Sequence, residues 1–142
     1  MEYRMKLHDA IRMAAWAHDK VLRDLIVERA VKKYKETGEK LDYVVFDGEN
    51  EAFKIAKRVF DEHIEEERKL SETARLNNIG IACEKAGDIE SAIAAYEECA
   101  AIGYPAEHCY ERLRIIYKKR KDFANMQRAI DMKFKAYSSQ AQ

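Results

Sequence analysis

The sequence predicts an all-α protein built from stacked antiparallel helical hairpins. Only five glycines and one proline occur in 142 residues, so few positions interrupt a helix. Charged residues make up 37% and apolar residues 47% of the chain, a composition that favours long amphipathic helices with exposed charged faces. A 34-residue offset also pairs similar residues, among them Ile79 with Leu113 and Asp88 with Asp122. This is the period expected of helix–turn–helix repeats.

The chain has the length of one domain, and we expect a single all-helical domain over residues 1–142. Its expected parts are N-terminal helices over 1–70, a first hairpin over 71–104, a second hairpin over 105–137 and a polar tail over 138–142.

The N-terminal part is expected to be helical with one packed loop. Residues 6–35 contain no glycine or proline and carry apolar residues at helical spacing, which predicts one long helix or two. Gly38 ends this segment, because a glycine can adopt the left-handed conformation that closes a helix. Residues 41–46 are rich in β-branched and aromatic side chains, but no partner strand is evident, so we expect a loop. The next helix covers 49–70 and ends near Leu70.

The two hairpins follow from Ser71 onward. Turns are expected at Lys85–Asp88 and after Lys119, and Pro105 suits the first turn of a helix because its missing N–H would lack an intrahelical partner. The second hairpin consists of helices over 106–119 and 122–137. The expected core positions of the first hairpin are Leu76, Ile79, Ala82 and Cys83 on its first helix and Ala92, Ile93, Ala95, Tyr96 and Cys99 on its second.

Residues 71–137 resemble the tetratricopeptide repeat family. In that family a first helix carries a bulky residue, then leucine-glycine, then an aromatic residue, and the turn and second helix have their own typical residues. The matching places here hold Leu76, Ile79-Gly80 and Cys83, then Gly87-Asp88, then Ala92, Tyr96 and Cys99. The second unit departs from the pattern at Arg114, Lys121 and Met126, as is usual for a terminal repeat.

The resemblance implies a short right-handed solenoid. A single hairpin cannot bury its own apolar stripe, so we expect the N-terminal helices to pack on the first repeat. Proteins of this family generally present a concave groove lined by the first helices. The groove positions implied here are Asn77, Ile81, Glu84, Glu111, Ile115 and Lys118.

These patterns predict a non-catalytic protein–protein interaction module, an adaptor or regulator that binds a segment of a partner protein. The alternative is a nucleic-acid-associated regulator that uses the basic surface around 112–121, which includes the run Lys118–Lys121. Nucleic acid is the weaker prediction, because acidic and basic residues balance at 26 each. The flanking Tyr117 and Phe123 fall on expected core positions, which makes them unsuited to base stacking.

No catalytic, metal or cofactor site is predicted. His63 and Glu67 lie one helical turn apart, but no third or fourth ligand can be assigned. Three cysteines without C-x-x-C spacing indicate buried thiols in a reducing compartment, so we expect a cytoplasmic protein. Charges interrupt the first 30 residues, and neither a signal peptide nor a membrane span is predicted.

Trp16 stands among small residues, where another helix can approach closely. Core packing is one interpretation. Self-association is the other, since acids outnumber bases over 47–102 while bases outnumber acids over 103–142.

Overall fold

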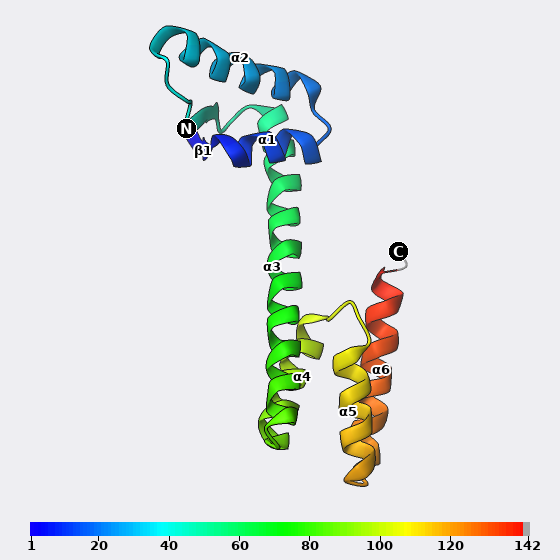
Figure 1. Ribbon diagram of the computed structural model, residues 1–142. Helices are drawn as coiled ribbons and strands as arrows, with labels where there is room; N and C mark the ends of the chain where they lie inside the picture. Colours follow the sequence, from blue (N-terminus) through cyan, green and yellow to red (C-terminus); the bar gives the residue numbers. More distant parts are fainter. Residues whose placement is uncertain (141–142) are drawn as a thin grey trace. The chain divides into compact units, whose positions relative to one another are not determined.

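The computed structural model describes residues 1–140 and is mainly helical, with one small antiparallel sheet (Figure 1). The chain divides into two compact units, Met1–Glu65 and Glu66–Gln142, whereas the sequence led us to expect one domain. The elements in chain order are β1 (Glu2–Lys6), α1 (Leu7–Trp16), α2 (Lys20–Thr37), β2 (Tyr43–Asp47), α3 (Glu51–Lys85), α4 (Ile89–Ile102), α5 (His108–Lys119) and α6 (Phe123–Gln140).

The first unit contains a two-stranded sheet that the sequence reasoning missed. β1 and β2 are antiparallel, with Met5 opposite Val44. The expected loop over 41–46 is therefore wrong, because the partner strand lies at the very start of the chain. β1 passes directly into α1 at Lys6 and Leu7, so no turn residue marks its end.

Two separate helices occupy residues 7–37, which resolves the choice between one helix and two. His18, with φ 53°, turns the chain after α1, and the Asp19 carboxylate accepts a hydrogen bond from the Leu22 N–H at 2.9 Å to cap α2. Gly38, with φ 73°, closes α2 as predicted, and its N–H donates to the Tyr34 carbonyl at 2.8 Å.

Residues 1–65 have a core of their own, formed by part of their apolar side chains. Their core consists of Met5, Ala10, Met13, Ala14, Leu22, Ile26, Val44, Phe46, Phe53, Ala56 and Phe60. Trp16 is half-buried and packs against this core, with its ring centroid 5.7 Å from that of Phe60, and it also stacks on His63 at 4.5 Å, so core packing accounts for this indole. The packing of the N-terminal helices on the first repeat stays a prediction.

α3 is one continuous helix, and the predicted end near Leu70 is wrong. Neither glycine nor proline occurs between Glu51 and Ile79, and most residues of this stretch are good helix formers. The Thr73 hydroxyl donates back to the Leu70 carbonyl at 2.9 Å, a bond that a threonine within a helix can make without ending it.

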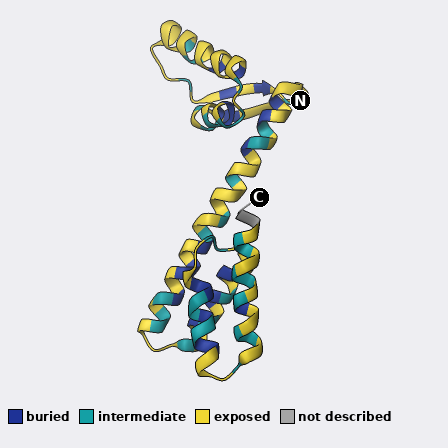
Figure 2. Cartoon of the chain, turned by 90° about the vertical axis from the view of Figure 1, so that its right-hand side faces the viewer, coloured by how far each residue is buried: buried dark blue, intermediate teal, exposed yellow. Residues whose placement is uncertain are grey.

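The second unit consists of the C-terminal part of α3 followed by α4, α5 and α6. In Figure 2 its buried and half-buried residues lie where these helices face one another. Their core is formed by Leu76, Ala92, Tyr96, Cys99, Ala100, Cys109, Tyr110, Leu113, Ile116, Tyr117 and Ala129.

The 34-residue period is visible in the turns of the second unit. After α3, the N–H groups of Gly87 and Asp88 donate to the carbonyls of Glu84 and Cys83 at 3.0 and 2.9 Å. After α5, the corresponding pairs are Lys121 to Lys118 and Asp122 to Tyr117, at the same two distances. Gly87 and Lys121 both have positive φ, 81° and 59°. Asp88 and Asp122 then cap α4 and α6 by accepting hydrogen bonds from the N–H groups of Ser91 and Asn125.

Several finer expectations for this unit are wrong. Ile79 and Ala82 are exposed rather than core, because the buried face of α3 carries Thr73, Leu76, Asn77 and Gly80 instead. Phe123, at the start of α6, is also exposed. Pro105 lies in the loop before α5, outside the helix. α6 extends through Ser138 to Gln140 where a tail was expected, and residues 141–142 of that tail lie outside the described residues.

Candidate functional site

Two of the predicted groove residues on α3 hold the second unit together. Asn77 is buried, and its side-chain oxygen lies 3.0 Å from Nδ1 of His108 on α5. The Glu84 carboxylate accepts hydrogen bonds from the Tyr96 hydroxyl at 2.7 Å and from Nε of Arg112 at 2.8 Å. These polar atoms therefore bridge α3 to its neighbouring helices.

The electrostatics of Glu84 fit this bridging role. The guanidinium of Arg112 donates to both carboxylate oxygens and lowers the pKa of Glu84, with a smaller contribution from the Tyr96 hydroxyl. Burial and the bond to Glu84 raise the pKa of Tyr96, so the phenol stays protonated and remains a donor. The cluster is a charge-assisted junction of three helices.

The other predicted groove positions are more accessible. Ile81 and Ile115 are half-buried, and Lys118 is exposed. Glu111 is engaged with α6, since its carboxylate accepts a hydrogen bond from Lys133 at 3.1 Å. The structure thus places the six predicted residues on α3 and α5, and it bonds Asn77, Glu84 and Glu111 to other residues of the unit.

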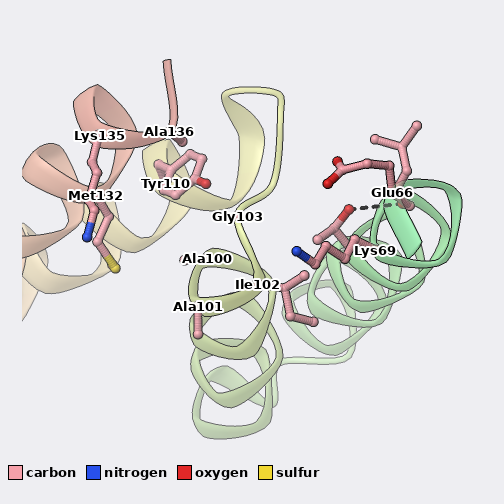
Figure 3. A pocket seen from close by; sticks show the side chains of 12 residues that line it. Glu66, Lys69, Ala100, Ala101, Ile102, Gly103, Tyr110, Met132, Lys135 and Ala136 are labelled. Carbon is pink, nitrogen blue, oxygen red and sulfur yellow. Dashed lines mark hydrogen bonds between the residues drawn. The ribbon is translucent and has the colours of Figure 1, made fainter. Parts of the chain in front are cut away.

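A hollow of about 700 Å³ in the second unit is lined by different residues (Figure 3). Four helices contribute to it, and none of the six predicted groove residues lines it. Its lining is formed by Glu66, Lys69, Leu70 and Thr73 of α3, Ala100, Ala101 and Ile102 of α4 with Gly103, Tyr110 of α5, and Met132, Lys135 and Ala136 of α6. We call this feature the α3–α4–α6 cavity.

The α3–α4–α6 cavity presents both apolar and polar surface to a ligand. The Tyr110 hydroxyl donates to the Tyr104 carbonyl at 2.8 Å, and the Thr73 hydroxyl is bonded to Leu70, so the polar groups of both side chains are already satisfied. Leu70 is 56% exposed and Ile102 is 36% exposed. In Figure 3, Glu66 and Lys69 on one side and Lys135 on the other flank the residues of α4. Such a site can receive apolar side chains of a partner between charged edges.

Sequence reasoning missed this cavity for two reasons. Its α3 wall includes residues 66–70, which were assigned to a separate N-terminal helix. Its floor is made by Ala100 and Ala101, whose small side chains leave space ahead of the left-handed Gly103, with φ 104°. The one signal for the cavity in the sequence was this alanine pair shortly before Gly103, the glycine that closes the helix. This signal does not indicate which ligand binds.

The basic run at the end of α5 is partly engaged. Arg120 pairs with Glu90 of α4 at 2.6 Å, whereas Lys118, Lys119 and Lys121 are exposed. Phe123 beside them is 57% exposed, contrary to the expected core position.

None of the histidine and cysteine side chains in the described residues lines the cavity. His63 stacks on Trp16, as described above, and within residues 1–140 no group of three or more His, Cys, Asp or Glu side chains is arranged to hold a metal ion. Cys83, Cys99 and Cys109 all lie in the described part of the chain as free thiols. The Cys99 thiol donates to the Thr73 carbonyl at 3.2 Å.

Comparisons with known proteins add no family to this description. The chain matches no protein-family model, no curated protein and no solved structure. Among the described residues, no helix combines the length and apolar character needed to cross a bilayer.

Proposed function

We propose that the second unit is a non-catalytic interaction module, an adaptor that binds a short segment of a partner protein in the α3–α4–α6 cavity. The observation that carries this proposal is the cavity itself. Its volume of about 700 Å³ lies within the range of roughly 300–1,000 Å³ typical of ligand sites. The exposed side chains of Leu70 and Ile102 offer apolar contacts to the partner segment. The charged residues Glu66, Lys69 and Lys135 at the edges of the cavity orient that segment.

The proposed ligand is a segment that inserts apolar side chains between α3 and α6. The floor consists of small alanines, so a bulky aliphatic or aromatic side chain of the partner fits better than a polar one. The hydroxyl hydrogens of Thr73 and Tyr110 already have acceptors, so neither is a free donor to a polar side chain of the partner.

We also propose that the two hairpins are tetratricopeptide-like repeats. Support comes from the turn hydrogen bonds that recur after 34 residues and from the close contact of Gly80 with Tyr96. In this proposal the cavity receives the partner in place of the implied groove, because Asn77 and Glu84 are engaged within the unit. The three free thiols favour a reducing, cytoplasmic location.

A substitution that fills the cavity with a large side chain tests whether the partner binds there. Ala101 lines the cavity and is exposed, so Ala101→Trp should block the hollow and leave folding intact. The matched control is Ala82→Trp, at an exposed position of α3 outside the cavity. Partners captured from the source cells with wild-type protein and identified by mass spectrometry should be lost with Ala101→Trp and kept with the control.

Two other results would assign partner binding to a different surface. Loss of the partner with the pair Glu111→Lys and Lys118→Glu, but not with Ala101→Trp, would place binding on the implied groove. Retention of nucleic acid whose affinity falls steeply with salt, and falls again with Lys119→Glu, would place it on the basic end of α5. Either result contradicts binding in the cavity.

A further inference from the structure

Cys99 and Cys109 meet in the core of the second unit. Cys99 lies in the last turn of α4, and Cys109 lies in the first turn of α5. Each residue has an exposed fraction of 0%, and both belong to the same buried cluster. The Cys109 thiol donates a hydrogen bond to the Cys99 sulfur. The two side chains are therefore free thiols whose sulfur atoms contact each other.

The hydrogen bonds of this pair distinguish the two sulfur atoms. The Cys99 thiol donates onward to the Thr73 carbonyl of α3 at 3.2 Å. The bond that Cys99 accepts from Cys109 lowers the pKa of Cys99, and the same bond together with burial raises the pKa of Cys109. Because the thiolate is the nucleophilic form of cysteine, Cys99 is the sulfur that reacts first with an electrophile that reaches the pair.

The wall of the α3–α4–α6 cavity adjoins both cysteines. Ala100 follows Cys99 and Tyr110 follows Cys109 in the sequence, and both of these neighbours line the cavity (Figure 3). Thr73, whose carbonyl accepts the hydrogen bond of Cys99, lines it as well. A molecule as small as hydrogen peroxide therefore needs only a small local opening of the wall to pass from the cavity to the thiols.

The connection between α4 and α5 can accommodate a covalent bond between the two sulfur atoms. A disulfide requires sulfur atoms about 2.05 Å apart, closer than two hydrogen-bonded thiols, so the two helix ends must approach each other. Residues 103–107 join α4 to α5 outside any helix, and Gly103 in this segment has φ 104°. This segment can change its dihedral angles without unwinding either helix. A disulfide is also uncharged, so it suits an apolar core better than a thiolate does.

We propose that Cys99 and Cys109 form a site of reversible oxidation, in which hydrogen peroxide converts the two thiols to an intrachain disulfide. The Cys99 sulfur attacks one peroxide oxygen and the O–O bond breaks, which leaves a sulfenic acid on Cys99 and releases the other oxygen as water with the proton of the Cys99 thiol. The Cys109 sulfur then attacks the Cys99 sulfur. The S–O bond breaks, and the hydroxyl leaves as water with the proton of Cys109. The two thiols together lose the two electrons that the peroxide gains.

Oxidation at this site changes the contact between α3 and α4. The disulfide removes the S–H group that Cys99 donates to Thr73, so the hydrogen bond between these helices is lost. The inference does not depend on partner binding in the cavity, because it rests on the contact of the two thiols and is tested without a partner.

Mass spectrometry of the full chain tests the disulfide. The native protein is treated with excess hydrogen peroxide, the peroxide is destroyed with catalase, and the remaining thiols are alkylated in urea. Two of the three alkylated cysteines should be lost, and all three should return after reduction with dithiothreitol. Cleavage after Glu107 separates the two cysteines, so the resulting peptides should stay joined until they are reduced.

Three variants serve as controls. Cys83→Ser keeps the pair and should form the same disulfide. Cys109→Ser and Cys109→Ala remove the second sulfur, so oxidation should stop at a sulfenic acid on Cys99, which dimedone captures. Circular dichroism checks that each variant keeps the wild-type helical content.

Three results would overturn the proposal. The first is a wild-type protein that keeps three alkylatable thiols after peroxide treatment, as expected if the cysteines only fill the core. The second is a disulfide that includes Cys83. The third is further oxidation of Cys99 to a sulfinic acid in the wild-type protein without any disulfide, since this would show that the two sulfur atoms cannot be joined.

Discussion

The ring of Tyr96 lies directly against Gly80, at the crossing of α3 and α4. A Cβ placed on Gly80 would lie 2.2 Å from Cε1 of Tyr96, well inside the distance that real Cβ atoms tolerate. Glycine at this position therefore allows the two helices to approach. The Tyr96 hydroxyl then reaches Glu84 on the same helix as the glycine, which fixes the ring in place.

Gly80→Ala should destabilise the protein by about 1–3 kcal/mol through overpacking. This is the opposite of the effect of glycine to alanine within an open helix, where alanine is favoured by about 1 kcal/mol. Urea denaturation measures the change. In a Tyr96→Leu background, which removes the ring, the same substitution should become neutral or stabilising. Equal destabilisation in both backgrounds would contradict the assigned contact.

Lys121→Gly should stabilise the second unit by about 0.5–1 kcal/mol, because Lys121 holds a left-handed backbone that costs a non-glycine residue about 1–2 kcal/mol. Gly87→Ala, at the corresponding turn, should destabilise by a similar amount. No atom lies within 4 Å of a Cβ built at Gly87, so the cost there is conformational. Thermal denaturation of both variants checks the pair. A stabilising Gly87→Ala would show that the two turns are not equivalent.

Glu84 should contribute stability that depends on pH. The Arg112 guanidinium lowers the pKa of this carboxyl in the folded state, so its contribution is complete above the pKa of the unfolded chain and disappears as pH falls through the folded value. Glu84→Gln should cost about 1.5–3 kcal/mol at pH 7, and the difference from wild type should shrink as pH falls from about 5 to 3. Urea titrations across that range measure it. Glu98→Gln, at an exposed position of α4, serves as the control and should change stability by less than about 0.5 kcal/mol.

The three thiols should differ in reactivity. Cys83 is half-buried, whereas Cys99 and Cys109 are buried. Hydrogen bonding to Cys99 and burial raise the pKa of the Cys109 thiol, which keeps it protonated and unreactive. A thiol-specific chromogenic reagent should therefore modify one cysteine quickly in the native protein and all three in urea. Equally fast modification of all three in native buffer would contradict the burial of this pair.

The two cores should respond separately to core truncation. Leu113 is buried in the second unit, and Leu113→Ala should destabilise that unit by about 2–5 kcal/mol. Trp16 is the only tryptophan and lies in the first unit. In Leu113→Ala, the unfolding midpoint followed by Trp16 fluorescence should therefore stay unchanged, while the midpoint followed by helical circular dichroism should fall. Ile26→Ala, in the first core, should move the Trp16 transition instead. A common shift of both probes in both variants would show one cooperative unit.

Local signals predicted the hairpins well. The turn at Gly87–Asp88 and the end of α2 at Gly38 were confirmed, because glycine with a left-handed backbone and an aspartate cap are determined by a few neighbouring residues. Ala92 and Tyr96 were also correctly expected in the core. Features that depend on distant residues were not predicted. The pairing of β1 with β2 joins residues about 40 positions apart, and neither strand alone indicates its partner.

The candidate site was harder to predict than the fold. A resemblance supplied the groove positions, but it could not indicate that Asn77 and Glu84 are engaged by His108 and Arg112, since those contacts depend on the packing of α3 against α5. The cavity depends on the continuation of α3 through residue 70, which no capping residue marked. Small side chains in the sequence show where space can exist, and only the packed helices show that it does.

The antiparallel pairing of β1 and β2 also sets the order of events during synthesis. β1 is translated first, yet it stays without a partner until Tyr43–Asp47 has been made, and the core beneath the sheet is incomplete until Phe60 follows. An unpaired strand with an apolar residue such as Met5 is open to association with other chains during that interval. The short β1, with charged residues at three of its five positions, limits this risk while the ribosome completes the first unit.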